Sequence, residues 1–362
     1  MKLLIVEDDK SQIQLYEDVI DSFNKKNDFQ ITTLAIDNLE DAKQALLSSD
    51  YDAAIVDLKL SSNSIELEGM ELVNEIVDKL RFPLFIVSGS ISQIEREENF
   101  LFKKRSRDGN FQNVLSELKE IYDTGIIQIL GKKGKIDEYL NKIFWEHLSS
   151  SMDIWINDDS RTSEQKHKVL LRYILLHIQE YLELTTESNF ENYHPAEIYI
   201  TPPIKNILFT GDVLIENESQ KRFIVLTPSC DLAHEGKTEN VLLVEIEHKE
   251  NGQISELKSI INDAEIGKDK KNNATAKLKN LIKNSVPKYH FLPDYKNLSA
   301  GLIDFQLLKS VPKNETISNY TRLTSVNNSF TKDIVARFSF YYSRQGSPDF
   351  NIDEIYDSII QA

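Results

Sequence analysis

Short apolar runs alternate with helical patterns in the first 130 residues of the chain. Residues 3–6 form the first such run, and Ile13, Tyr16, Ile20 and Phe23 recur at helical spacing directly after it. An apolar run without polar alternation is typical of a strand that is buried on both faces of a parallel sheet. The pattern therefore predicts an α/β domain with a doubly wound parallel sheet and helices on both of its faces.

Five strands follow from this pattern. The last is expected at 126–130, where isoleucines and a leucine cluster, and a helix is expected from about Ile136. The stretch between Ser90 and Gly125 is too long for one helix and its loops, so 91–124 is interpreted as an insertion. The predicted strands lie at 3–6, 29–35, 53–58, 83–88 and 126–130, and the predicted helices between them at 11–23, 39–47 and 70–80.

The pattern changes twice after this domain. Helical spacing continues to about Leu184, and after Thr185 short strand-like runs recur between turn signals such as Gly211-Asp212 and Asn251-Gly252. We therefore expect an α/β domain over 1–147, a helical connector over 148–185 and a mainly β (α+β) domain over 186–362. The strands predicted in the last domain lie at 197–200, 213–215, 223–226, 241–246, 301–308 and 336–342, with a lysine-rich helical insert at 256–284.

Composition narrows the functional classes. The formal net charge of -16 argues against non-specific binding to a nucleic-acid backbone, which needs a basic surface. The single cysteine, Cys230, excludes an intramolecular disulfide and a cysteine-cluster zinc site. No apolar run approaches the roughly 20 residues that span a bilayer. The first apolar run ends at Glu7 and does not resemble a signal peptide, so we expect a cytoplasmic protein.

Polar residues follow the predicted strands at their carboxyl ends. Glu7 and Asp8 follow the first strand and Asp57 ends the third, so all three carboxylates are expected at one edge of the sheet. Clustered carboxylates repel unless a cation or a proton neutralises them, and oxygen ligands suit Mg²⁺. Ser88 ends the fourth strand and Lys132 follows the fifth, which adds a hydroxyl and an ammonium. This set is what phosphoryl transfer to an aspartate needs.

These segments closely resemble the receiver domain of two-component response regulators, which has a flavodoxin-like fold. The resemblance is carried by Leu4-Ile5-Val6-Glu7-Asp8-Asp9, Ile55-Val56-Asp57-Leu58, Ile86-Val87-Ser88-Gly89 and Lys132. It implies that Asp57 accepts the phosphoryl group, that Ser88 is a conformational switch and that Lys132 is the cation on the phosphoryl group. Glu7, Asp8, Asp57 and the backbone carbonyl of Lys59 would then hold Mg²⁺. Asp9 is expected to cap the first helix.

Several departures from the family pattern indicate an atypical branch. Lys133 stands where the family usually has proline, and Ile129 stands where it usually has an aromatic switch residue. The loop after Asp57, at 61–66, is longer than usual. The basic residues of the predicted insertion, Lys103-Lys104-Arg105 and Arg107, are interpreted as a solvated tip, with partner docking as the alternative.

A second candidate site lies in the last domain. Cys230, Asp231 and His234 put a thiol, a carboxylate and an imidazole within five residues, which could build a nucleophilic site. Cys230 and His234 could also be two metal ligands, too few for a closed site. The alternative, which we prefer, is that Cys230 is a small buried hydrophobe beside a core strand.

The resemblance also implies partners. A receiver takes its phosphoryl group from a histidine kinase, and the β domain, which weakly resembles small SH3-like barrels, would relay the signal to a protein effector. A homodimer is compatible with this. The whole arrangement looks like the regulator component of Detocs-type phage-defence systems. The alternatives are a receiver-controlled enzyme with a site near Cys230, and a phosphate sink that drains the kinase.

Overall fold

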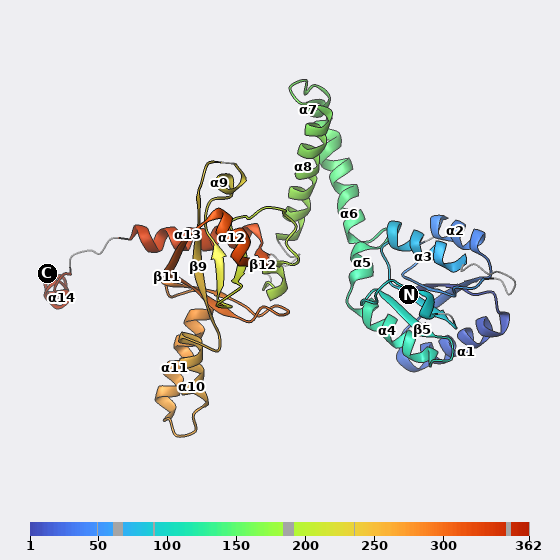
Figure 1. Ribbon diagram of the computed structural model, residues 1–362, viewed down its shortest axis with the longest axis horizontal. Helices are drawn as coiled ribbons and strands as arrows, with labels where there is room; N and C mark the ends of the chain where they lie inside the picture. The colour runs from blue at the N-terminus through green and yellow to red at the C-terminus, as the bar shows by residue number, and fades with distance from the viewer. Residues whose placement is uncertain are drawn as a thin grey trace. The chain divides into compact units, whose positions relative to one another are not determined.

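The chain forms two compact units, Met1–Glu191 and Asn192–Ala362 (Figure 1). The computed structural model describes residues 1–48, 50–60, 68–89, 91–183, 192–234, 236–344 and 349–361. The connector that was predicted at 148–185 falls within the first unit. In the part of the chain that is described, none of the helices combines the length and the apolar character that a membrane span needs.

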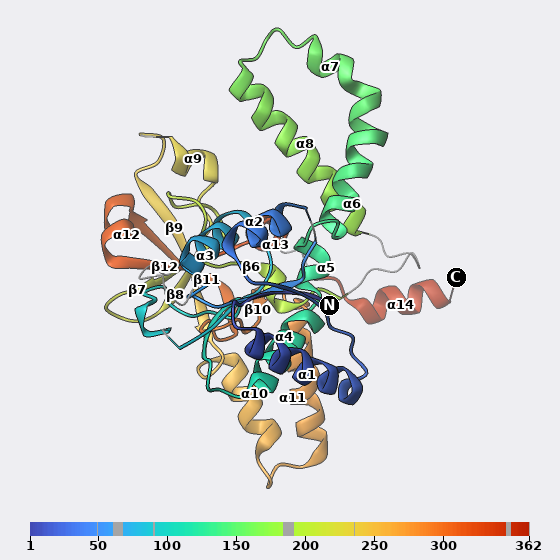
Figure 2. The same cartoon turned by 90° about the vertical axis from the view of Figure 1, so that its right-hand side faces the viewer.

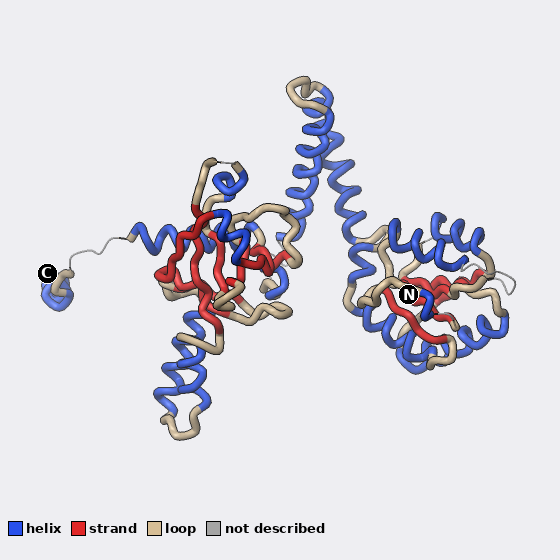
Figure 3. The backbone as a smooth tube through the Cα atoms, in the orientation of Figure 1, coloured by secondary structure: helices blue, strands red, loops and turns tan. Residues whose placement is uncertain are grey.

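The first unit contains a five-stranded parallel sheet of order β2-β1-β3-β4-β5, covered by helices on both faces (Figures 1 and 3). This confirms the predicted fold class. The strands are β1 (Lys2–Val6), β2 (Thr32–Ile36), β3 (Ala53–Val56), β4 (Leu84–Ser88) and β5 (Phe102–Ser106), and the covering helices are α1 (Lys10–Asn27), α2 (Leu39–Ser48), α3 (Glu68–Lys79) and α4 (Phe111–Asp123).

Alternating strand residues build two cores, one on each face of the sheet. Leu3 and Ile5 pack with α1 and α4, whereas Leu4 and Val6 pack with α2 and α3. Because successive strand side chains point to opposite faces, a strand between two helical layers must be apolar at every position. Helix α1 begins where predicted, since the Asp9 carboxylate accepts a hydrogen bond from Ser11 N at 2.8 Å.

The predictions of the fifth strand and of the insertion are wrong. Residues Ile126–Leu130 form a helix, α5, and β5 lies within the segment that was interpreted as an insertion. A five-residue apolar run fits a strand and a buried helical turn equally well, so its composition could not decide. The true strand is basic because β5 is the edge of the sheet, where side chains are partly exposed. Among the described residues between β4 and β5, a short 3₁₀ turn, Ile91–Gln93, is the one helical element.

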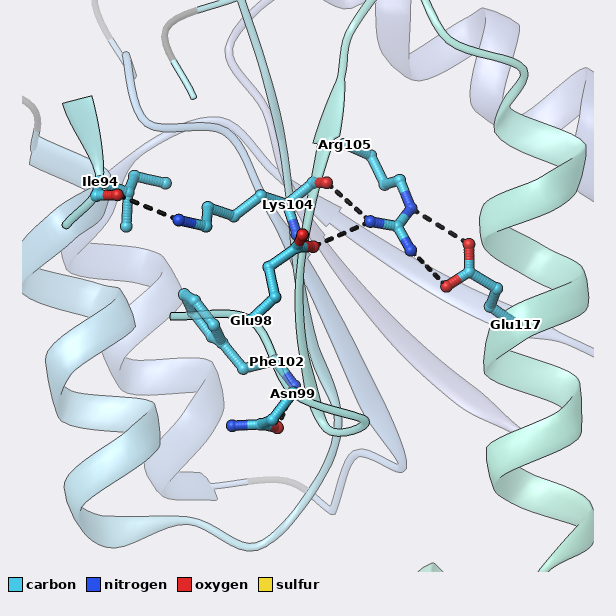
Figure 4. A network of polar contacts seen from close by, with 7 residues as sticks. All are labelled: Ile94, Glu98, Asn99, Phe102, Lys104, Arg105 and Glu117. Atoms are coloured by element: carbon cyan, nitrogen blue, oxygen red, sulfur yellow. Dashed lines mark hydrogen bonds and ion pairs between the residues drawn. The ribbon is translucent and has the colours of Figure 1, made fainter. Parts of the chain in front are cut away.

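The free edge of β5 is covered by polar side chains from its own approach loop (Figure 4). Glu98 Oε1 accepts hydrogen bonds from Lys104 N at 2.7 Å and from Arg105 Nη1 at 2.9 Å. Lys104 Nζ donates to the carbonyl of Ile94 at 3.0 Å, and Arg105 pairs with Glu117 of α4. Side chains that occupy an edge in this way block pairing with another strand.

A helical hairpin completes the first unit, and Figure 2 shows its two arms joined by the turn between α7 and α8. The first arm is α6 (Lys135–Lys142), a π-helical segment (Ile143–Leu148), a 3₁₀ turn (Ser149–Ser151) and α7 (Met152–Ile156); the second arm is α8 (Ser163–Glu183). Aromatic rings join the arms. Tyr139 stacks on Tyr181 with ring centroids 5.2 Å apart, and Trp155 meets Tyr173 edge-on at 5.4 Å.

The second unit is a seven-stranded sheet of order β10-β11-β9-β8-β7-β12-β6, and the pairs in it are antiparallel. This confirms a mainly β domain, whereas the resemblance to SH3-like barrels stays a prediction. The strands are β6 (Tyr199–Ile200), β7 (Asp212–Glu216), β8 (Arg222–Val225), β9 (Asn240–His248), β10 (Tyr289–Leu292), β11 (Gly301–Pro312) and β12 (Tyr320–Val326).

The second unit also contains helices. The lysine-rich insert is the helix pair α10 and α11, as predicted, but the strand predicted at 336–342 is wrong because these residues lie in helix α13. The Asn327 side chain caps α13 by accepting hydrogen bonds from Ser329 N and Phe330 N. The helices are α9 (Ser229–Ala233), α10 (Gln253–Asn262), α11 (Lys268–Ile282), α12 (Lys313–Asn319), α13 (Asn328–Ser343) and α14 (Ile352–Ile360), with a 3₁₀ turn at Pro195–Ile198.

Candidate functional site

Three carboxylates meet at the carboxyl ends of β1 and β3. Glu7 and Asp8 follow β1, Asp57 follows β3, and the two strands are hydrogen-bonded neighbours. Asp57 N donates to the carbonyl of Val6 at 2.8 Å, which continues the ladder up to the site. One carboxylate oxygen from each acid lies within 4.8 Å of the others. The structure therefore brings together the acids that the sequence analysis selected.

Two of these acids are buried. The Glu7 side chain is 1% exposed and that of Asp57 is 3% exposed, whereas Asp8 is partly buried. Burial raises the pKa of Glu7 from its usual 4.5 to about 7; the amide of Asp9 opposes this rise and the nearby charge of Asp57 adds to it. A buried pair of acids needs a positive charge nearby if both are to stay ionised.

Arg107 supplies that charge. It follows β5 by one residue, and its Nη2 lies 3.0 Å from both carboxylate oxygens of Glu7 and 2.6 Å from Asp57 Oδ2. Burial works against the charge of Arg107, but attraction by Asp57 and Glu7 more than offsets it, so the pKa of the guanidinium lies above its usual value. Arg107 N also donates to the carbonyl of Ser88 at 3.3 Å, which links β5 to β4.

The prediction that Lys132 is the cation of the site is not supported. Lys132 follows helix α5 instead of a strand, and its Nζ donates to the carbonyl of Leu46 in α2 at 3.1 Å. The adjacent Lys133 pairs with Asp50 at 2.7 Å. This contact, together with the charge of Lys132, lowers the pKa of the Asp50 carboxyl. Asp50 precedes β3 and Asp57 follows it, so these lysines lie toward the amino end of β3, away from the acids at its carboxyl end.

The remaining predicted residues surround Asp57. Ser88 ends β4, the neighbour of β3, and is 2% exposed. The side chain of Lys59 is exposed, and its carbonyl as a metal ligand stays a prediction. Gly69, at the start of α3, packs against the acceptor loop: a Cβ there would lie 2.2 Å from the carbonyl oxygen of Asp57. Only glycine permits this approach. The predicted long loop at 61–66 lies outside the described residues.

Polar atoms at this site remain unpaired although they are buried. Among the described residues, Asp57 Oδ1, Arg107 Nε and Tyr16 Oη have no hydrogen-bond partner. Tyr16 stacks on Phe111 with ring centroids 4.1 Å apart, and burial, followed by the charge of Glu7, raises the pKa of its hydroxyl to about 12. Buried polar atoms are rarely left without a partner, so the site has capacity for a polar ligand.

The donor set fits Mg²⁺. Carboxylate oxygens are the ligands that this hard cation prefers, and one oxygen of each of the three acids lies within reach of a shared ion. Glu7, Asp8 and Asp57 are the residues that would hold the ion, with Arg107 as a cation already in contact with two of them.

The second candidate site is less organised. Cys230 is exposed, and its Sγ lies 3.4 Å from Asp231 Oδ1, so the alternative of a buried cysteine is wrong. The Asp231 carboxylate pairs with Lys237 at 2.9 Å, which lowers its pKa together with the contact to Cys230. His234 is exposed after α9. Within the described part of the chain, no hydrogen bond joins His234 to Cys230.

Comparisons with known proteins give partial likenesses. A scan against protein-family models finds no match, and a search of curated proteins finds no relative. Among solved structures, a receiver domain (CheY-like) from Methylobacillus flagellatus is 20% identical, with 33% of this chain and 98% of that chain covered and a TM-score of 0.27.

Two further solved structures are similar at the same level. The response regulator TrrA from Thermotoga maritima, in complex with Mg²⁺–BeF, is 17% identical over 33% of this chain and 96% of that chain, with a TM-score of 0.26. A response regulator from Burkholderia pseudomallei with a phosphorylated aspartic acid and a calcium ion is 14% identical over 49% and 96%, with a TM-score of 0.26. Likeness at this level carries no argument about function, which has to come from the site itself.

Proposed function

We propose that this protein is a response regulator that accepts a phosphoryl group on Asp57. The observation that carries the proposal is a buried carboxylate with one oxygen bound to a guanidinium and the other unpaired. The first oxygen is neutralised while the second remains available as a nucleophile. A partner histidine kinase would donate the phosphoryl group, since an aspartate attacks phosphorus only in an activated donor.

The residues of the site divide the work of the transfer. Asp57 Oδ1 attacks phosphorus in line, the bond from phosphorus to the donor's imidazole nitrogen breaks, and its electron pair stays on the imidazole. Arg107 would pair with the oxygens of the transferred phosphoryl group, because a guanidinium binds phosphoryl oxygens through two parallel hydrogen bonds. This is the role that the sequence analysis gave to Lys132. Mg²⁺, when held by Glu7, Asp8, Asp57 and the Lys59 carbonyl, would neutralise charge on the transferring group.

Ser88 and β5 are the route by which the modification reaches the rest of the domain. A phosphorylated Asp57 adds about one and a half to two negative charges at the ends of the strands. Ser88 is adjacent and would turn its hydroxyl to a phosphoryl oxygen. Because Arg107 follows β5 directly and its amide bonds to Ser88, a movement of the guanidinium would shift the end of that edge strand.

The proposed output is recognition of a protein effector by the second unit, in phage defence and in the cytoplasm. The net charge of -16 makes nucleic acid a poor partner. An enzyme site near Cys230 is a weaker candidate because the thiol is exposed and its neighbour Asp231 is engaged by Lys237. A phosphate sink differs from the leading proposal only in its output.

Beryllium fluoride, which mimics an aspartyl-bound phosphoryl group, tests the site without any kinase. In the presence of Mg²⁺ we expect the wild-type protein to bind it, with bound fluorine signals in ¹⁹F NMR. Asp57→Asn keeps the shape but removes the anionic oxygen and should abolish these signals. Asp52→Asn, at a partly buried residue before β3 that accepts a hydrogen bond from Lys2 N, should not. Equal binding to the Asp57→Asn variant would contradict the proposal.

A further inference from the structure

Helix α8 carries apolar residues on two opposite sides. One side faces the first arm of the hairpin, where Tyr181 stacks on Tyr139 and accepts or donates a 2.9 Å hydrogen bond with His147 Nε2. The other side carries Leu171, Leu175 and Leu182, which are 58%, 56% and 66% exposed. Because these leucines are separated by four and seven residues, they form one stripe along the helix.

A hairpin of two helices cannot bury such a stripe itself. The first arm also exposes large apolar side chains, since Phe144 and Trp145 are 56% and 70% exposed. A helix that is apolar on opposite sides is ordinarily enclosed by other helices, and an exposed apolar patch of this kind marks an interaction surface. The stripe therefore requires an occupant.

The charges of α8 identify what fits against it. In its first half, 163–172, Lys166, Lys168 and Arg172 against Glu164 give a net charge of +2; in its second half, 173–183, Glu180 and Glu183 give -2. A copy of the same helix that runs in the opposite direction places each basic half beside an acidic half. A parallel copy would place like charges together, which is unfavourable.

We propose that α8 pairs antiparallel with α8 of a second copy of this chain, so that two hairpins form a four-helix bundle. The apolar stripe has the same symmetry as the charges. When the two-fold axis passes between Leu176 and His177, Leu171 lies opposite the partner's Leu182, and Leu175 lies opposite the partner's Ile178. A two-fold interface of this kind is self-complementary, as closed dimers require. The proposal is independent of phosphorylation at Asp57.

Mixed disulfide formation tests both the partner and the direction. In a Cys230→Ser background, Leu171→Cys protein mixed with Leu182→Cys protein should form a disulfide-linked dimer under mild oxidation, because these positions face each other. Neither variant should form one alone, since its own copies lie eleven residues apart along the axis, about 16 Å at 1.5 Å per residue, beyond the Cα separation of a disulfide. Crosslinking of each variant with itself would overturn the antiparallel arrangement.

Mass in solution gives the second readout. The full chain should have twice its 41.7 kDa mass by light scattering, and Leu171→Glu with Leu175→Glu should return it to a single chain. Ile317→Glu, at an exposed isoleucine of the second unit, is the matched control and should remain dimeric. Circular dichroism of the leucine variants checks that the helix is retained. A wild-type chain that is monomeric overturns the proposal. A dimer that persists in the Leu171→Glu with Leu175→Glu variant overturns it as well.

Discussion

Arg107 shows how a single residue determines the electrostatics of the site. Its Nη2 contacts Glu7 and Asp57 at once, which lets two buried acids coexist. A lysine would offer a compact point charge, whereas the planar guanidinium presents several donors in a fixed fork and can keep one carboxylate while it engages a new anion. Arg107 also occupies the oxygen atoms that a divalent cation would use, so cation and guanidinium compete for Asp57 and Glu7.

This competition predicts a specific response to Mg²⁺. Arg107→Ala should lower the free energy of unfolding of the first unit by about 2 kcal/mol, less than the ~3–5 kcal/mol of a fully buried pair, because Arg107 is 29% exposed. Mg²⁺ should then stabilise the variant more than the wild-type protein, as denaturant unfolding with and without the ion will show. Arg105→Ala, which leaves the acids untouched, is the control. An Mg²⁺ effect that is equal in Arg107→Ala and wild type would contradict the competition.

A second residue-scale prediction concerns His290 in β10. Burial lowers its pKa from 6.5 to about 4, with the charge of Asp333 opposing the shift. The unfolded chain therefore binds more protons than the folded chain between these values, and stability should fall as the pH is lowered from 6.5 to 4, by on the order of 2–3 kcal/mol.

Proton NMR of the histidine rings measures this directly. The ring of His290, assigned through His290→Gln, should titrate near pH 4, well below the usual 6.5 of a histidine. Titration of His290 near 6.5 would show that its ring is solvated.

At the scale of elements, β5 explains how the site is completed. Arg107 reaches the acids because it follows this strand directly. Glu98 contacts the outer edge of the strand, and its pKa is lowered mainly by the amide of Lys104 and to a smaller extent by Arg105. Glu98→Ala should remove about 1 kcal/mol of stability and expose the amide of Lys104. Hydrogen exchange should therefore speed up at Lys104 but not at the inner strand β3, and Glu97→Ala should leave both unchanged. Unchanged exchange at Lys104 would mean that Glu98 does not hold the edge.

Strands that are buried on both faces could be predicted from the sequence, whereas a partly exposed edge strand could not. The inner strands β1, β3 and β4 are apolar at nearly every position and are correctly placed by the sequence alone. The edge strand β5 has one buried residue, Phe102, so its pattern of lysine and arginine resembled a solvated loop. The aromatic run of α13 was mistaken for a strand because aromatic residues favour strands where no helix cap is recognised.

The same cause decided which site residues were found. The acids follow inner strands, Ser88 is the last residue of one, and all were identified by position. Arg107 follows the edge strand and was missed, and the positive charge was assigned to Lys132 instead. One local signal was present: Gly109 and the helix cap Asn110 come two and three residues after Arg107, and a turn with a cap marks the end of a strand before a helix.

At the scale of the molecule, the site lies within the first of the two compact units. The residues that contact Asp57 lie in Met1–Glu191, so phosphorylation should not need the β domain. A chain without residues 186–362 should accept a phosphoryl group at the rate of the full chain. If the protein is a sink, that shortened chain should still drain a kinase; if it recognises an effector, the output should be lost. Loss of phosphorylation in the shortened chain would contradict the independence of the two units.

The most direct test of the account is intact-mass measurement after incubation with Mg²⁺ and acetyl phosphate. The wild-type protein should gain one phosphoryl group, and Asp57→Ala should gain none. Lys132→Ala should behave as wild type, whereas Arg107→Ala should react roughly a hundredfold more slowly, because it removes a positive charge from the transferring group. An adduct that persists in Asp57→Ala, or that is lost in Lys132→Ala while Arg107→Ala reacts normally, would contradict the central claim.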